Sequence, residues 1–202
     1  MGKLFCIMGK SSSGKDSIYR QIMEETELSL KPVIPYTTRP VRMGEKEGRE
    51  YHFCSEEMVQ ELEDGGKVIE LRAYNTVYGI WKYFTVDDGQ INLEDSSYLY
   101  IVTLEGYVKI QKYFGKDRVE PIYIEVDDGE RLLRAIEREK QQEKPQYEEM
   151  CRRFLADAAD FSEEKLKEAG ITKRFVNRKL KETICEVTAY IKQGITIQNS
   201  LE

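Results

Sequence analysis

The chain has 202 residues, 40% of them hydrophobic and 34% charged, with a formal net charge of −6. This length suits one compact domain with one or two inserted lobes, and such a chain can bury a sizeable core, which argues against gross disorder. The acidic balance argues against a nucleic-acid partner, because affinity for that backbone comes largely from Lys and Arg. The four cysteines form no CxxC pair and no run approaches membrane-spanning length, so we expect reduced thiols in a cytoplasmic protein without a membrane partner.

The N-terminal segment predicts a strand, a loop and a helix in that order. Lys3–Met8 is a short apolar run, typical of a buried strand. Small residues fill the loop Gly9–Gly14. Lys15–Glu25 places Ile18 and Ile22 on one helical face.

The segment 30–88 differs in composition from its flanks and predicts an inserted lobe. It combines prolines, an Arg-rich turn and scattered tyrosines. Ser55 is placed to cap a helix that ends at Gly65 and Gly66. Val68–Leu71 is a candidate strand.

The remainder of the chain alternates strands with helices. Strands are expected at 97–104, 118–126 and 171–177, and helices at 105–113, at 129–161 with a break near Pro145, and from Leu180 to Ile191. This alternation predicts an α/β fold with a parallel sheet flanked by helices.

A phosphate-binding pattern, Gly-x4-Gly-Lys, lies between the first strand and the first helix. It reads Gly9, Lys10, Ser11, Ser12, Ser13, Gly14, Lys15, Asp16 and Ser17. The glycines let the backbone approach phosphate oxygens, and the loop N–H groups form an anion nest before the helix N-terminus. Lys15 would reach the β- and γ-phosphates, so this P-loop predicts binding of a nucleoside triphosphate and transfer of its terminal phosphoryl group.

The P-loop departs from the usual pattern at Asp16, where Ser or Thr normally provides a hydroxyl to Mg²⁺. A carboxylate oxygen also suits this hard cation, so we expect Asp16 to be a Mg²⁺ ligand, directly or through water. The alternative is that Asp16 caps the helix and Ser17 serves the metal.

A second motif begins at Thr37 and reads TTRPVRMGEKEGREYHF. It resembles the hallmark of the guanylate kinase family, which it matches at the family spacing at Thr37, Thr38, Arg39, Arg42, Gly44, Glu45, Gly48, Tyr51 and Phe53. The resemblance spans most of the chain and weakens after about Asp127. It implies ATP-dependent phosphorylation of GMP to GDP with Mg²⁺, on a P-loop NTPase fold. The implied parts are a core of 1–32, 90–127 and 161–200, a GMP-binding acceptor lobe of 33–89 and a helical lid of 128–160. The final residues 201–202 look like a tag remnant.

The resemblance also implies the acceptor contacts, which fall on Arg39, Arg42, Glu45, Tyr51, Glu70 and Tyr78. The two arginines would grip the dianionic phosphate of GMP with charge-assisted hydrogen bonds, and the tyrosines would add hydroxyl donors. Glu70 falls where the family places a carboxylate that accepts hydrogen bonds from guanine N1 and the 2-amino group.

Four positions depart from the family pattern. Pro35 and Ile80 replace hydroxyl residues near the base, and Ile101 and Thr103 stand where two aspartates are typical. Fewer polar groups directed at the base argue against strict guanine selectivity. The carboxylate lost at Thr103 and the one gained at Asp16 suggest that the charge around Mg²⁺ is roughly kept.

Transfer between phosphates needs little general base, so we expect catalysis by alignment and charge neutralisation, with Lys15 and Arg39 as catalytic groups. In the lid, Arg138 and Arg153 are the best matches to two family arginines, with Arg134 and Arg152 as alternates. The alternative for each is a charged helical surface with Glu–Arg pairs.

Asn177 aligns loosely with a family position near the adenine of ATP. The alternative is that it caps a helix beginning at Arg178.

Two other functions stay open from the sequence. The first is a P-loop kinase with another small phosphorylated acceptor, and the second is a binding module of the same architecture without catalysis. Such modules usually have an eroded P-loop, whereas Gly9, Gly14 and Lys15 are intact here.

Overall fold

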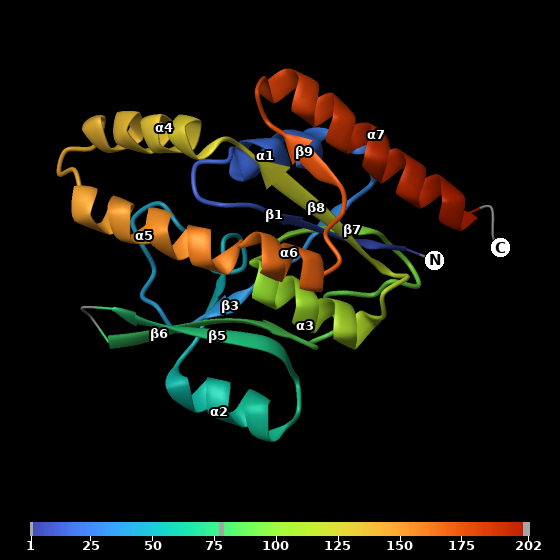
Figure 1. Cartoon of the computed structure of the whole chain (residues 1–202). Coiled ribbons are helices and arrows are strands. Elements are labelled where there is room, and N and C mark those ends of the chain that lie inside the picture. The colour runs from blue at the N-terminus through green and yellow to red at the C-terminus, as the bar shows by residue number, and fades with distance from the viewer. Residues whose placement is uncertain (1, 77–78, 200–202) are drawn as a thin grey trace.

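The computed structural model describes residues 2–76 and 79–199. Its larger sheet has the strand order β2-β7-β1-β8-β9, and all of its pairings are parallel. The strands are β1 (Leu4–Met8), β2 (Lys31–Pro32), β7 (Tyr98–Ile101), β8 (Val119–Glu125) and β9 (Arg174–Val176). Helices cover the two faces of this sheet (Figure 1). The predicted α/β fold with a parallel sheet flanked by helices is confirmed.

The central strand β1 is buried on both faces, as its apolar sequence predicts. Leu4, Cys6 and Met8 belong to one core cluster, and Phe5 and Ile7 to another. All five side chains have no exposed surface. Burial of one such large apolar side chain contributes about 1.5–3 kcal/mol, so β1 is a rigid base for the loop that follows it.

Four helices pack against this sheet: α1 (Lys15–Glu24), α3 (Leu104–Phe114), α6 (Glu163–Glu168) and α7 (Leu180–Asn199). Ile18 and Ile22 of α1 are fully buried, one helical turn apart. Thr103 caps α3 by accepting a hydrogen bond from the Gly106 N–H. The short helix α6 is not among the predicted elements.

The segment predicted to form the acceptor lobe is built on a second sheet of order β4-β3-β6-β5. Its elements are β3 (Tyr36–Thr37), β4 (His52–Phe53), α2 (Glu56–Asp64), β5 (Val68–Thr76) and β6 (Gly79–Val86). Ser55 caps α2 by accepting from the Met58 N–H, as predicted. The strand expected at 68–71 is longer than predicted, and its antiparallel partner β6 was not predicted.

The predicted lid consists of two helices, α4 (Asp128–Lys140) and α5 (Tyr147–Asp160), which run back on one another (Figure 1). The predicted break near Pro145 is confirmed. The two separate sheets and this helical pair support the proposed division into core, acceptor lobe and lid, while positions 201–202 lie outside the described residues.

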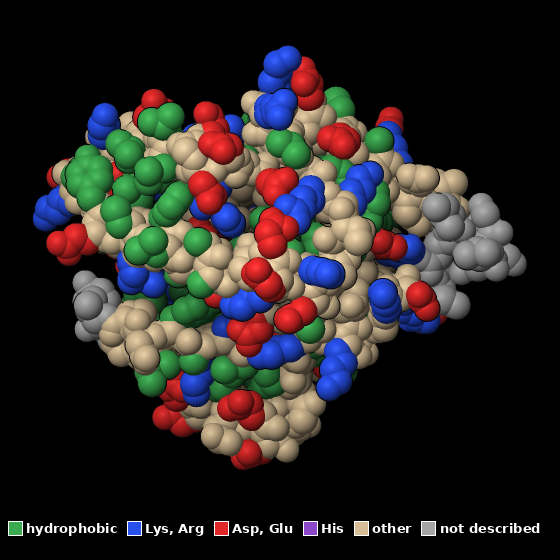
Figure 2. Space-filling model, viewed as in Figure 1, with side chains coloured by type: hydrophobic (Ala, Val, Ile, Leu, Met, Phe, Trp, Pro, Cys, Tyr) green, Lys and Arg blue, Asp and Glu red, His purple; other side chains and the backbone are tan. Residues whose placement is uncertain are grey.

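The surface mixes both signs of charge over the face formed by α3, α5 and α6, whereas hydrophobic side chains gather on the lid (Figure 2). Leu133 and Leu155 are among the exposed hydrophobic residues there. Among the helices that the structure describes, none is long and apolar enough to cross a bilayer.

Candidate active site

The P-loop connects β1 to α1 in a conformation that its small residues permit. Gly14 has φ 86° and Ser12 has φ 62°, both in the left-handed region. A Cβ on Gly14 would lie 2.5 Å from Asn177 Nδ2, and one on Gly9 would lie 2.5 Å from the carbonyl oxygen of Ile124. Glycine is therefore required at both positions for the loop to pack this closely on the sheet.

Two loop hydroxyls support binding of phosphate at this loop. The Oγ atoms of Ser12 and Ser13 are buried and have no hydrogen-bond partner in the described part of the chain. A buried polar group without a partner is costly, and a phosphate oxygen is a strong acceptor that would satisfy it. The N-terminus of α1 stands directly behind these groups and favours an anion.

Asn177 anchors the P-loop to the last strand and the C-terminal helix. Its Nδ2 donates to the Ser13 carbonyl oxygen at 2.8 Å, and its Oδ1 accepts from Thr183 Oγ1 at 3.3 Å. The alternative of a cap for a helix starting at Arg178 is wrong, because α7 starts at Leu180. Contact with adenine stays a prediction.

Lys15 and Asp16 form the first turn of α1. Lys15 Nζ lies 3.6 Å from Asp16 Oδ2, and the Asp16 side chain is 72% exposed. The N-cap of α1 is Gly14, with no side-chain hydrogen bond at the cap, so the alternative that Asp16 caps the helix is wrong. Asp16 is therefore open to a ligand.

The donors present fit Mg²⁺. No group of three or more His, Cys, Asp or Glu stands ready for a metal ion within the described residues. Mg²⁺ in kinases is usually held by one or two protein oxygens together with substrate phosphates and water. The Asp16 carboxylate and the Ser17 hydroxyl, adjacent at the start of α1, supply such oxygens.

Arg39 is held in place by an ion pair with Glu45. Its Nη1 and Nη2 donate to the two carboxylate oxygens of Glu45 at 2.7 and 2.6 Å. The guanidinium also lies 4.9 Å from the centre of the Tyr51 ring and 5.5 Å from that of Phe53. Arg39 is only 4% exposed, and its hydrogen bonds to Glu45 lower the pKa of that carboxyl to about 2. Contact between Arg39 and the acceptor phosphate stays a prediction.

Arg42 and Tyr51, two other predicted acceptor residues, contact this pair. The Arg42 N–H donates to Glu45 at 2.9 Å, and the Arg42 side chain faces the lid across a cavity described below. Tyr51 lines the cavity that also contains the P-loop. Tyr78 lies outside the described residues.

Glu70 is buried and already paired. Arg72 Nε donates to Glu70 Oε2 at 2.9 Å and Arg72 Nη2 donates to Oε1 at 3.1 Å. Thr85 Oγ1 donates to Oε1 at 2.9 Å and shares a hydrogen bond of 2.8 Å with the Tyr100 hydroxyl. The carboxylate predicted to read guanine is thus engaged by an arginine that the sequence did not single out. The predicted Glu70–guanine contact stays untested.

The lid arginines differ in where they point. Arg152 and Arg153 donate through Nε to Glu149, each at 2.7 Å, and both line the acceptor cavity. Arg138 faces the neighbouring cavity. Arg134 donates to the Asn177 carbonyl oxygen at 3.2 Å and therefore lies against the other side of the P-loop.

A lid contact with the P-loop was not predicted. Asp157 of α5 accepts a hydrogen bond from the Ser11 N–H at 2.7 Å. The buried Arg131 of α4 donates to the Ser11 carbonyl oxygen at 3.0 Å, and its Nη1 lies 3.4 Å from Asp157. Arg131 also pairs with Asp128 at 2.8 Å. No local pattern marks these residues, because they join segments more than a hundred positions apart.

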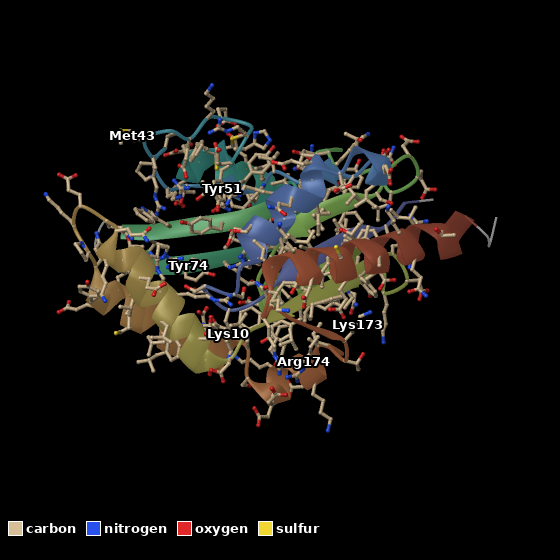
Figure 3. The ribbon with its side chains drawn as sticks, turned by 90° about the horizontal axis from the view of Figure 1, so that it is seen from above. Lys10, Met43, Tyr51, Tyr74, Lys173 and Arg174 are labelled. Atoms are coloured by element: carbon tan, nitrogen blue, oxygen red, sulfur yellow. The ribbon has the colours of Figure 1, made fainter. Side chains whose placement is uncertain are left out.

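Two cavities meet at this centre. One of about 360 Å³ is lined by the P-loop, the acceptor lobe and α5, including Lys15, Tyr51 and Arg153. The other, about 710 Å³, lies between the lobe and the lid, including Arg42 and Arg138. The P-loop, Tyr51 and Arg153 thus line the smaller cavity, and Arg42 and Arg138 line the larger one. The predicted acceptor residues Arg39, Glu45 and Glu70 line neither of the two. Seen from above, Tyr51 and Tyr74 lie on the acceptor lobe and Lys10 at the P-loop, with Met43 at the outer edge (Figure 3).

Known proteins that are similar to this chain are guanylate kinases. The family model described as guanylate kinase matches residues 1–193. A guanylate kinase of Porphyromonas gingivalis is 32% identical over 126 residues, which cover 61% of this chain and 65% of that protein. One of Mycoplasma mobile is 40% identical over 82 residues, covering 40% of this chain and 41% of that protein. The chain thus spans less than two thirds of the length of these relatives.

A solved structure shows the same fold. The crystal structure of guanylate kinase from Anaplasma phagocytophilum superposes with a TM-score of 0.65, at 20% identity, over 95% of this chain and 85% of that one. The family model covers nearly the whole chain, and the P-loop, the acceptor motif and the lid all face one centre. This chain therefore belongs to the guanylate kinase family.

Proposed function

We propose that this protein transfers the γ-phosphoryl group of ATP to GMP, yielding ADP and GDP. The observation that carries the proposal is the shared cavity, in which P-loop residues such as Lys15 face acceptor-lobe residues such as Tyr51, with Arg152 and Arg153 of the lid alongside. Donor and acceptor phosphates would therefore be held within one cavity.

The transfer needs charge neutralisation more than proton removal. A phosphate oxygen of GMP attacks the γ-phosphorus, the bond from that phosphorus to the β–γ bridging oxygen breaks, and ADP leaves with the electron pair. The acceptor phosphate is already largely ionised near pH 7, since its second pKa is about 6. Lys15 would neutralise the β- and γ-phosphates, while Arg42 and the lid arginines would neutralise the acceptor and the transferred group.

Magnesium would be held by Asp16, directly or through water, with Ser17 beside it. When bound, the ion neutralises phosphate charge and orients the β- and γ-oxygens. Lid closure over the two cavities would then bring Arg138 and Arg153 toward the transferred group and exclude water as a competing acceptor. We further propose a cytoplasmic location.

The test is an ADP-release assay with ATP, Mg²⁺ and a panel of nucleoside monophosphates and sugar phosphates. Turnover with GMP, lowered about 10²–10³-fold in Lys15→Ala and unchanged in the exposed control Lys116→Ala, is the expected result. Turnover confined to another acceptor would establish the alternative kinase. Nucleotide binding without any turnover would establish a non-catalytic module.

A further inference from the structure

A buried ion pair joins Glu70 to Arg72, and Arg72 lines the smaller of the two cavities. Two N–H groups of Arg72 meet the two carboxylate oxygens at 2.9 and 3.1 Å, and the Thr85 hydroxyl adds a third hydrogen bond. The Glu70 side chain has no exposed surface, whereas that of Arg72 is 12% exposed. A ligand entering here meets the guanidinium before it can meet the carboxylate.

The pair is fixed from several sides. Arg72 Nη1 lies 3.4 Å from Thr103 Oγ1, at the N-terminus of α3. A Cβ on Gly106 would lie only 3.5 Å from Glu70 Oε2, so α3 packs directly on the carboxylate. Burial lowers the pKa of Arg72, but the charge and hydrogen bonds of Glu70, together with Tyr100 and Tyr74, outweigh it and raise that pKa. Moving Arg72 aside would leave a buried charge without a partner, which is strongly unfavourable.

From the acceptor lobe, the cavity receives one charged side chain among the described residues. Among the described lobe residues that line it, Arg72 is the charged one, and the others are Pro35, Tyr51, Tyr74 and Tyr83. From the core, residues 100–103 line the same cavity. The carboxylates that line this cavity, Asp157 and Asp160, come from the lid.

We propose that Arg72, held by Glu70, is the residue that selects the acceptor base, and that it does so by donating hydrogen bonds. This inference rests on the proposed transfer to a nucleoside monophosphate. A guanidinium has donors and no acceptor. Guanine presents O6 and N7 as neighbouring acceptors that an arginine can meet together, whereas adenine presents an amino donor at the same 6-position.

The consequence is an unusual selectivity among purines. With Glu70 engaged, no lobe carboxylate in the described cavity reads the 2-amino group or N1–H of guanine. Hypoxanthine, which keeps O6 and N7 but lacks the 2-amino group, therefore fits as well as guanine. The 6-oxo group is required and the 2-amino group is not.

The experiment compares GMP, IMP and AMP as acceptors, by kcat/KM and by calorimetric binding without ATP. The wild type is expected to use GMP and IMP within about threefold of each other, since no hydrogen bond to the 2-amino group is at stake, and to disfavour AMP about 10²-fold or more. Arg72→Met frees the Glu70 carboxylate, so the GMP to IMP ratio is expected to rise about tenfold or more. Arg49→Met, an exposed arginine of the same lobe, is the control and leaves both ratios unchanged.

A second variant guards against a folding failure. Glu70→Gln with Arg72→Met removes both charges and avoids a lone buried carboxylate. It is expected to bind all three nucleotides with affinities within about threefold of one another, because neither the Arg72 guanidinium nor the Glu70 carboxylate is left.

Three results would overturn the proposal. The first is a wild type that disfavours IMP as strongly as AMP. The second is an Arg72→Met protein whose GMP to IMP ratio is unchanged. The third is an Arg72→Met protein that loses kcat/KM equally for all three acceptors, which would place Arg72 at the phosphate instead. The calorimetric arm separates this proposal from the proposed activity. Binding in the order GMP equal to IMP and above AMP, without turnover, supports base selection by Arg72 and refutes the kinase. Turnover with GMP but not with IMP supports the kinase and refutes base selection by Arg72.

Discussion

The Asp157 carboxylate accepts a hydrogen bond from the Ser11 N–H at 2.7 Å, so the lid helix places a negative charge on the loop that is built to hold phosphate. Arg131 lies beside both partners and partly balances that charge. The lid and the phosphate site are therefore coupled through one short contact, and substitutions at either end should be felt in nucleotide binding.

Removing the charge of Asp157 is expected to strengthen ATP binding. Asp157→Asn keeps the shape and the acceptor oxygen but removes like-charge repulsion with the phosphates, which is worth about 1–1.4 kcal/mol, or about five- to tenfold in Kd. Calorimetric titration with ATP and Mg²⁺ measures it. Glu148→Gln, on the exposed side of the same helix, is the control. Weaker binding in Asp157→Asn would show that the contact helps to form the site.

Loss of Arg131 is expected to destabilise the fold. Its side chain is 1% exposed and pairs with Asp128 and Asp157, and its guanidinium lies 4.6 Å from the Phe154 ring centre. Arg131→Ala removes a buried side chain that donates to the Ser11 carbonyl oxygen, Asp128 and Asp157, and is expected to cost about 2–5 kcal/mol of unfolding free energy. Arg134→Ala, at a site 30% exposed, is expected to cost less than about 1 kcal/mol. Equal urea midpoints for the two variants would refute this.

Asp16→Ser tests the metal assignment. The substitution restores the hydroxyl usual at this position and removes a charged oxygen ligand, so the Mg²⁺ concentration for half-maximal activity is expected to rise about tenfold, equivalent to about 1.4 kcal/mol. Activity at a series of Mg²⁺ concentrations and constant ATP measures it, with the exposed Asp117→Ser as control. Full activity with the same Mg²⁺ dependence would remove Asp16 from the metal site.

The Arg39–Glu45 pair predicts a pH dependence of stability. The pKa of Glu45 falls from 4.5 to about 2 in the folded chain, chiefly through its hydrogen bonds from Arg39. A depressed carboxyl pKa stabilises the fold at pH values above the unfolded pKa, and the benefit disappears as the pH falls through the folded value. Relative to Glu45→Gln, the wild type is expected to be about 1.5–3 kcal/mol more stable at pH 7. That advantage should shrink between pH 4.5 and about 2.

Urea unfolding of both proteins across this pH range provides the check. Glu63→Gln, an exposed carboxylate on α2, is the matched control and should show no comparable difference. An advantage for the wild type that stays constant down to pH 3 would contradict the assignment.

Local patterns predicted the P-loop, the cap at Ser55 and the alternation of strands and helices, because each depends on residues close in sequence. The strand β6 was missed, since Gly79–Val86 places Lys82 among aromatic residues and shows no clean alternation. The Glu70–Arg72 pair could have been predicted from the sequence. Residues two apart in a strand share a face, so opposite charges at that spacing can pair. The Ser11–Asp157 contact could not have been predicted from a local pattern, because 146 positions separate the partners.

The position of Trp81 has a practical consequence. It is the one tryptophan of the chain, and it lines the cavity between the acceptor lobe and the lid, together with Met150 and Arg153 of α5. Closure of the lid would change the polarity and the quenching groups around this indole. Its intrinsic fluorescence should therefore report closure on nucleotide binding in the unlabelled protein, in real time.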